Sequence, residues 1–231
     1  MTNLTRVSRF GLVNALLVEE EDGLTVVDTG LVRSAKAIRA AADRLGRPIA
    51  RILLTHAHGD HVGSLDALAE GLPGVEVLIS ERDAPLLAQD KTPRPGEPGD
   101  ARYRGSYPGT RTRPTRLLVP GDRVGSLEVL AAPGHTPGHV ALLDTRDRTL
   151  LAGDAYSTLG GVATSAAPNW RFPLPFAATW HRGLALRSAR ELRALDPARL
   201  APGHGKVVEA PAAAMDAAIA RADAWLRRGR G

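Results

Sequence analysis

Cysteine is absent from this chain of 231 residues. Its absence excludes disulfide bonds, thiolate metal ligands and a cysteine nucleophile. Any metal ion must therefore be bound through nitrogen and oxygen atoms. A chain without cysteine is compatible with either redox compartment.

Long apolar runs are also missing. No run approaches the ~20 residues that a membrane span needs. The first 21 residues lack the basic start, apolar stretch and small-residue cleavage site of a signal peptide. We therefore expect a cytoplasmic protein that does not associate with a membrane.

Lysine is scarce, since only Lys36, Lys91 and Lys206 are lysines among the 30 basic residues. The formal net charge is nevertheless +5, because arginine is abundant. A mild positive excess favours anionic partners without naming one. We expect the partner to be a small-molecule substrate. The positive charge would allow that substrate to be anionic.

Strand-like and helical segments alternate along the first half of the chain. Two short strands are expected around the turn at residues 21–23, followed by a helix at 34–46, a buried strand at 49–55 and a helix at 64–74. This alternation is typical of a layered α/β domain. The length suits one such domain, which we place at residues 1–231.

A loop rich in proline, glycine and arginine interrupts the pattern at residues 90–116. Loops of this length inside a compact domain are usually functional or disordered. Strands then resume, an irregular stretch covers 157–176, and helices are expected at 177–197 and 211–229. Both halves run from sheet to helix, which permits a pseudo-symmetric sandwich.

The segment LTHAHGDHVGS, residues 54–64, holds three of the seven histidines of the chain. In an extended segment, His56, His58 and Asp60 would point to the same side, because side chains alternate along a strand. His61 would diverge from Asp60. One loop at the end of a strand can therefore face two metal ions.

Three further candidate ligands each follow a predicted strand: His135 in APGHTPGH, Asp154 in LLAGDA and His204 in LAPGHG. Ligand sites in layered α/β folds gather at strand ends. We count neither His139 nor His181 as a ligand. His139 is expected to form a hydrogen bond in the core, and His181 to pack at the surface.

The ordered set T-H-x-H-x-D-H, G-H-T-P-G-H, G-D and P-G-H-G resembles the metallo-β-lactamase superfamily, and is most similar to its glyoxalase II-like and lactonase-like hydrolases. The resemblance implies a four-layer αββα sandwich with the site on one edge. It implies two metal sites, with these ligands: His56, His58 and His135 at the first, Asp60, His61 and His204 at the second, and Asp154 bridging both. It also implies that Asp28 in VVDTG supports the site from behind the ligands.

Two divalent ions held in this way are the expected cofactors. Zinc is the usual metal for such ligands, and manganese and iron also fit them. Metal ions lower the pKa of bound water towards ~7, so a bridging hydroxide can attack a carbonyl carbon at neutral pH. We expect cleavage of an ester, a thioester or a lactone, with Asp60 passing a proton to the leaving group and Tyr156 donating a hydrogen bond to the oxyanion.

Three alternatives stay open. A phosphodiesterase or nuclease of the same superfamily would suit the positive charge, although aromatic side chains are rarely interleaved with the basic ones, which makes nucleic acid the less favoured partner. A mononuclear iron enzyme of the persulfide dioxygenase kind would share most of the ligands. A non-catalytic metal-binding module is the third. The sequence leaves the oligomeric state open, a homodimer included.

Overall fold

The computed structural model describes residues 3–229. These residues cluster into two compact units. Of the described residues, unit 1 comprises 3–90 and 106–119, and unit 2 comprises 91–105 and 120–229. Each unit is described separately, and a single domain at 1–231 stays a prediction.

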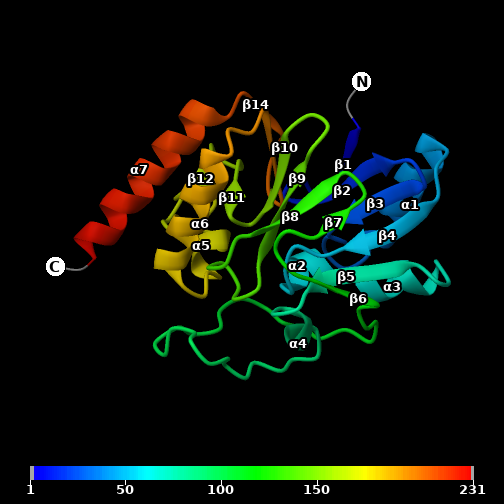
Figure 1. The fold of residues 1–231 in the computed structure, drawn as a ribbon, viewed down its shortest axis with the longest axis horizontal. Coiled ribbons are helices and arrows are strands. Elements are labelled where there is room, and N and C mark those ends of the chain that lie inside the picture. Colours follow the sequence, from blue (N-terminus) through cyan, green and yellow to red (C-terminus); the bar gives the residue numbers. More distant parts are fainter. Residues whose placement is uncertain (1–2, 230–231) are drawn as a thin grey trace. The chain divides into compact units, whose positions relative to one another are not determined.

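Unit 1 contains a six-stranded sheet in the described residues, in the order β1-β2-β3-β4-β5-β6 (Figure 1). Its strands are β1 Leu4–Arg9, β2 Val13–Glu20, β3 Gly23–Val27, β4 Ile49–Leu53, β5 Glu76–Ser80 and β6 Arg116–Leu118. Strands β1 to β3 pair in antiparallel fashion, and β3 to β6 pair in parallel. Parallel pairing brings the carboxyl ends of β3 and β4 to the same edge of the sheet.

The helices of unit 1 are short: α1 Ala35–Leu45, α2 Gly59–Val62, α3 Leu65–Glu70 and α4 Ala84–Leu87. Helix α1 buries Ile38 and Ala41 and contacts both β1 and α3 (Figure 1). It ends at Gly46, whose φ of 65° permits the left-handed turn that closes the helix. The helices predicted at 34–46 and 64–74 are thus present. Strand β1 and helix α2 are not among the predicted elements.

Unit 2 contains a second six-stranded sheet in the described residues, in the order β14-β13-β10-β9-β8-β7. Its strands are β7 Arg123–Val124, β8 Leu127–Ala131, β9 Val140–Asp144, β10 Thr149–Gly153, β13 Arg199–Pro202 and β14 Val208–Glu209. Strands β10 and β13 are parallel, whereas β8, β9 and β10 are antiparallel in turn. A small hairpin, β11 Tyr156–Ser157 with β12 Ala163–Thr164, follows β10.

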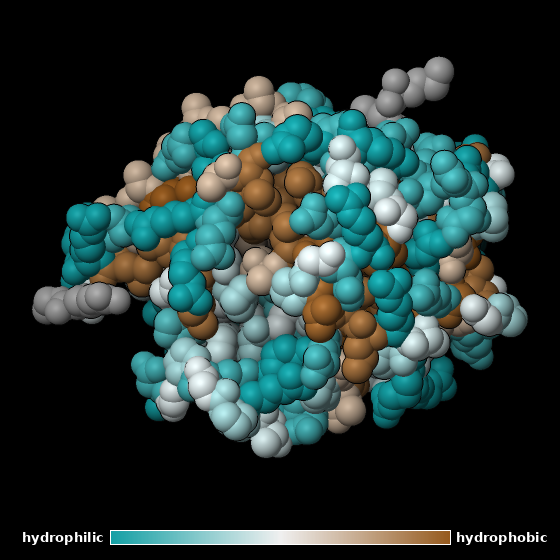
Figure 2. Space-filling model, in the orientation of Figure 1, coloured by the Kyte–Doolittle hydropathy of each residue, from teal (hydrophilic) through white to brown (hydrophobic). Residues whose placement is uncertain are grey.

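Three helices belong to unit 2: α5 Leu174–Ala177, α6 Arg182–Ala194 and α7 Ala212–Arg228. Leu192 and Met215 on the two long helices join Leu150 and Leu200 of the sheet in one hydrophobic cluster. Burying such a side chain stabilises the fold by about 1.5–3 kcal/mol. The surface along α7 is mixed, since hydrophilic and hydrophobic atoms lie side by side there (Figure 2).

Helix α6 begins five residues later than the sequence predicts. The backbone of His181 is extended, and its Nδ1 atom accepts a hydrogen bond from the Leu184 amide, so the histidine caps the helix. The residues before it form the separate turn α5. Across residues 3–229, no helix combines the length and the apolar character required to cross a bilayer.

Candidate metal centre

The histidine cluster of unit 1 follows directly from strand β4. The chain leaves β4 at Leu53, and His58 has an extended backbone that starts the one-turn helix α2. Asp60 and His61 therefore lie on a helical turn. The strict alternation predicted for His56, His58 and Asp60 is wrong beyond His58, because the extended segment ends there.

The three imidazoles of this cluster lie close together and are buried. The ring centroids of His56 and His58 are 4.9 Å apart, and those of His56 and His61 are 4.1 Å apart. None of the three residues is more than 2% exposed. The carboxylate of Asp60 differs, since 36% of its side chain is exposed, and its Oδ2 atom lies 3.9 Å from His61 Nε2.

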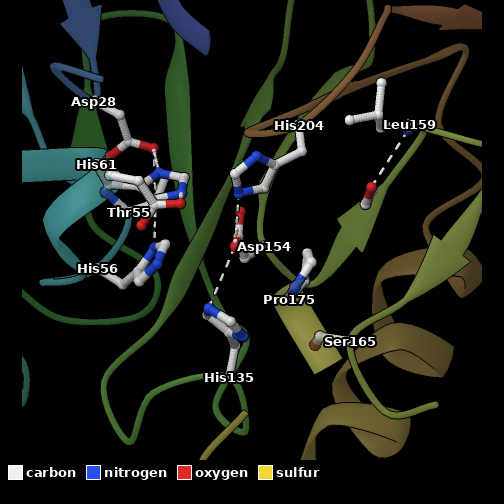
Figure 3. Close-up of polar contacts among 12 residues, drawn as sticks. Asp28, Thr55, His56, His61, His135, Asp154, Leu159, Ser165, Pro175 and His204 are labelled. Carbon is white, nitrogen blue, oxygen red and sulfur yellow. Dashed lines mark hydrogen bonds and ion pairs between the residues drawn. The ribbon is translucent and has the colours of Figure 1, made fainter. Parts of the chain in front are cut away.

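Asp28 holds this cluster from the end of the neighbouring strand β3. Its carboxylate accepts hydrogen bonds from the Thr55 amide and the Thr55 hydroxyl, both at 2.8 Å. It also lies 2.8 Å from His61 Nδ1 (Figure 3). We therefore assign the His61 proton to Nδ1, which leaves the Nε2 lone pair for a metal ion. The supporting role predicted for Asp28 agrees with these contacts.

The backbone at Asp28 has a φ of 61°, in the left-handed region that costs a non-glycine residue energy. Its carboxylate compensates by binding three groups of the metal loop. Thr55 extends the same network, because its hydroxyl lies 3.0 Å from His56 Nδ1. That contact gives His56 the same orientation as His61: the Nδ1 atom of each ring faces the scaffold.

Unit 2 places its three predicted ligands together. The Asp154 Oδ2 atom lies 3.3 Å from His135 Nε2 and 3.1 Å from His204 Nε2 (Figure 3). All three residues are buried. Parallel pairing explains two of them, since Asp154 follows β10 and His204 follows β13. His135 lies between the antiparallel strands β8 and β9, at the edge where β10 ends.

A threonine orients His135 as Thr55 orients His56. The Thr179 hydroxyl lies within hydrogen-bonding distance of the carbonyls of Ser165 and Pro175, at 3.0 and 2.7 Å. Its oxygen lies 3.1 Å from His135 Nδ1, so we assign that nitrogen as the donor. The Nε2 atom of His135 consequently faces Asp154. Sequence reasoning missed Thr179, because 44 residues separate it from the ligand.

Gly134 makes the turn before His135 possible. Its φ is +136°, and a Cβ atom there would lie 2.2 Å from the Ala185 amide nitrogen. Backbone cannot give way as a flexible side chain can, so only glycine fits. The start of α6 and the His135 loop are thereby packed in direct contact.

His139 is not placed as a ligand would be. Its Nε2 atom accepts a hydrogen bond of 2.9 Å from the Asp154 amide, and the residue is buried. The predicted hydrogen bond in the core is confirmed. His139 thus fixes the backbone of a candidate ligand.

Tyr156 lies in the core of unit 2. Its side chain is fully buried, and its hydroxyl donates a 2.7 Å hydrogen bond to the Ala189 carbonyl. Burial raises the pKa of the phenol above its ordinary value. Since the hydroxyl proton is donated to helix α6, this geometry contradicts the oxyanion role predicted for Tyr156.

The donor atoms of each unit suit a divalent metal ion bound through nitrogen and oxygen. In both units, buried imidazoles direct Nδ1 towards a hydroxyl or a carboxylate of the scaffold, the arrangement that commonly supports histidine ligands. A buried carboxylate held between two imidazoles adds a charged oxygen ligand in unit 2.

Comparison with known proteins agrees with this chemistry. The model of the metallo-beta-lactamase superfamily matches residues 8–204. The chain is 47% identical over 210 residues to YobT of Bacillus subtilis (strain 168), an uncharacterized protein, with 91% of this chain and 90% of YobT covered. It is 32% identical to a hydroxyacylglutathione hydrolase of Stenotrophomonas maltophilia (strain R551-3), over 63% of this chain but only 46% of that enzyme.

Among solved structures, TTHA1623 in a di-iron-bound form matches with a TM-score of 0.64 and 26% identity, over 90% of this chain and 95% of that one. The match to the family model extends from the first strand to the last candidate ligand, His204. The chain therefore belongs to the metallo-β-lactamase superfamily of metallo-hydrolases and has its fold.

Proposed function

We propose that the two groups of ligands together hold two divalent metal ions, most simply zinc, and that the protein hydrolyses an ester, thioester or lactone bond. The observation that carries this proposal is the Asp154 carboxylate, buried between the Nε2 atoms of His135 and His204. Such a carboxylate needs a compensating cation, and metal ions supply one.

Membership of the superfamily supports the assignment of ligands between the two sites. His56, His58 and His135 would form the first site, Asp60, His61 and His204 would form the second, and Asp154 would bridge them. When bound, the ions would lower the pKa of a water molecule and would act as Lewis acids towards the substrate oxygen.

The chain itself supplies orientation and proton transfer. Asp28, Thr55 and Thr179 hold the imidazoles by their Nδ1 atoms, which directs the Nε2 atoms towards the metal ions. Asp60 is the candidate ligand whose carboxylate is partly exposed, so it is the group that can pass a proton to the departing oxygen or sulfur.

The choice of an acyl bond rests on the hydroxyacylglutathione hydrolase relative, whose name denotes cleavage of a thioester. Glutathione itself is not part of the proposal, because less than half of that enzyme aligns with this chain.

The test combines metal analysis with turnover. We expect about two zinc or manganese ions per chain in protein purified without added metal, and hydrolysis within a panel of esters, thioesters and lactones. Asp60→Asn should abolish hydrolysis, whereas Asp43→Asn, an exposed position on α1, should not.

One result would replace the proposal with a different function. The di-iron form of TTHA1623 makes iron the second candidate metal. One iron ion per chain, with oxygen consumption in the presence of a persulfide, would make the protein an oxidoreductase.

A further inference from the structure

A cavity of about 460 Å³ lies in unit 2, lined by helix α7 and by residues 160–171, which include strand β12. Strand β12 and α7 contact each other (Figure 1). None of the described residues that line the cavity is a candidate metal ligand. Cavities of this size bind small molecules. Unit 2 therefore has room for a ligand that does not contact the metal-binding side chains.

The charged side chains that line this cavity are two arginines, Arg171 and Arg221, and no carboxylate lines it in the described residues. Within residues 3–229, neither guanidinium forms an ion pair with a carboxylate. Arg221 donates a hydrogen bond to the Val162 carbonyl, which directs its guanidinium towards the loop between β11 and β12. A guanidinium has five N–H donors, so this bond leaves others for a ligand.

The carboxylates of α7 are paired with other arginines. Asp216 lies 2.9 Å from Arg193, and Asp223 lies 2.7 Å from Arg190, and both of these arginines belong to α6. Neither aspartate lines the cavity. The cavity therefore has a positive charge that no lining carboxylate neutralises, and such a charge favours an anionic ligand.

An apolar surface lies beside the positive charge. Trp170 lines the cavity and is 89% exposed, whereas tryptophan is highly buried on average in folded proteins. The flat face of an exposed indole can pack against a planar ring. Helix α7 contributes only small apolar side chains opposite the arginines, and these leave room for such a ring: Ala214, Ala217 and Ala218.

The loop that carries Trp170 and Arg171 is held by its own contacts. The Asn169 side-chain amide donates a 3.0 Å hydrogen bond to the Leu159 carbonyl, and its Oδ1 atom accepts one of 3.1 Å from the Arg171 amide. A Cβ atom at Gly160 would lie 2.5 Å from the Arg171 Cβ atom, so glycine lets the two ends of the loop pack together. Side chains placed before a ligand arrives lose less entropy when it binds.

We propose that this cavity binds a small organic anion that carries a planar aromatic ring. Arg171 and Arg221 pair with the anionic group, and Trp170 packs against the ring. The inference goes beyond the proposed hydrolysis and does not depend on it, because none of these residues is a candidate metal ligand.

The test is calorimetric titration of the full chain with naphthalene-2-sulfonate, an aromatic anion that binds metal ions weakly, and with methyl 2-naphthyl sulfone, its uncharged analogue. We expect the sulfonate to bind about tenfold more tightly than the sulfone. The double variant Arg171→Gln with Arg221→Gln should lose this preference and still bind the sulfone as the wild type does.

A matched control removes the same charge elsewhere in unit 2. Arg123 and Arg187 are exposed and do not line the cavity. The double variant Arg123→Gln with Arg187→Gln should therefore keep the preference for the sulfonate. Equal affinity of the wild type for the two probes, or an unchanged preference in Arg171→Gln with Arg221→Gln, overturns the inference.

The role of Trp170 has a separate readout. Trp170→Ala should weaken binding of both probes, whereas Leu174→Ala, at an exposed position that does not line the cavity, should weaken neither. The chain has three tryptophans, so labelling with nitrogen-15 gives three indole N–H signals in an NMR spectrum. The sulfonate should shift the Trp170 signal most, and an unshifted Trp170 signal places the probe outside this cavity and overturns the inference. None of these measurements requires turnover, so loss of the proposed function would leave their outcome unchanged.

Discussion

The two units present their candidate ligands in different ways. Unit 1 concentrates four of them in six consecutive residues, from His56 to His61, whereas unit 2 collects three from separate strand ends. In unit 1 a carboxylate outside the ligand set, Asp28, binds the cluster from behind. In unit 2 the carboxylate is itself a candidate ligand, Asp154, and lies between the imidazoles.

One chemical requirement is thus met by local order in unit 1 and by long-range order in unit 2. Both units orient imidazoles through Nδ1 and both bury a carboxylate next to them. Loss of the carboxylate should nevertheless have unequal consequences, because only one of the two is proposed to contact metal.

The largest expected effect is that of Asp154→Ala. Removing a bridging ligand should lower metal affinity by more than about 100-fold, beyond the usual effect of a residue behind the ligands. Competition with a chelator followed by elemental analysis measures it. Asp147→Ala, on the turn before β10, is a control for loss of a carboxylate in unit 2. Retention of both metal ions in Asp154→Ala would show that Asp154 is not a bridging ligand.

Asp28→Asn should have a smaller effect. The side-chain amide has one acceptor oxygen where the carboxylate has two, so it cannot accept the hydrogen bonds of both Thr55 and His61. Metal affinity should therefore fall by about 10–100-fold. The same chelator competition compares it with Asp43→Asn, an exposed position. If Asp28→Asn binds metal as tightly as the wild type, the contact between Asp28 and His61 does not contribute to metal affinity.

Gly63→Ala tests the packing of the metal loop without touching a ligand. A Cβ atom there would lie 2.6 Å from the Gly59 carbonyl oxygen and 2.7 Å from the Val32 amide nitrogen. Overpacking of this kind typically costs about 1–3 kcal/mol of stability. Chemical denaturation should show this loss, whereas Gly99→Ala, where a Cβ atom meets open space, should be close to neutral.

The smallest effect is expected from Tyr156→Phe in the core of unit 2. Loss of the hydrogen bond to Ala189 should cost about 0.5–1.5 kcal/mol and leave turnover within a few-fold of the wild type. If turnover instead fell by about two orders of magnitude at unchanged metal content, the loss would match that of an oxyanion donor and restore this role to the tyrosine.

The same variant has a pH signature. Burial raises the pKa of the folded-state phenol above its unfolded value of about 10. A group with a raised folded pKa contributes stability that is complete below the unfolded pKa and is lost at higher pH. The wild type should therefore lose more stability above pH ~10 than Tyr156→Phe does, as measured by denaturation at about pH 8 and about pH 11.

Much of the fold could be predicted because periodicity is local. The helix at Ala35–Leu45 and the buried strand at Ile49–Leu53 follow from the spacing of their apolar residues. The start of α6 could not be predicted in this way. Residues 177–181 continue a helical pattern, but His181 caps the helix and the preceding turn carries Thr179 to His135.

The available chemistry can be read from the residues alone: no thiolate, seven candidate nitrogen and oxygen ligands in the order of one superfamily, and glycines where the chain turns sharply. The groups that support those ligands are visible only in the folded chain. Asp28 contacts His61 because parallel strands end at one edge of a sheet. The Tyr156 hydroxyl is not placed as an oxyanion donor because it donates its hydrogen bond to a helix far along the chain. Such pairings depend on strand direction and packing between residues far apart in the chain, which no local pattern of residues records.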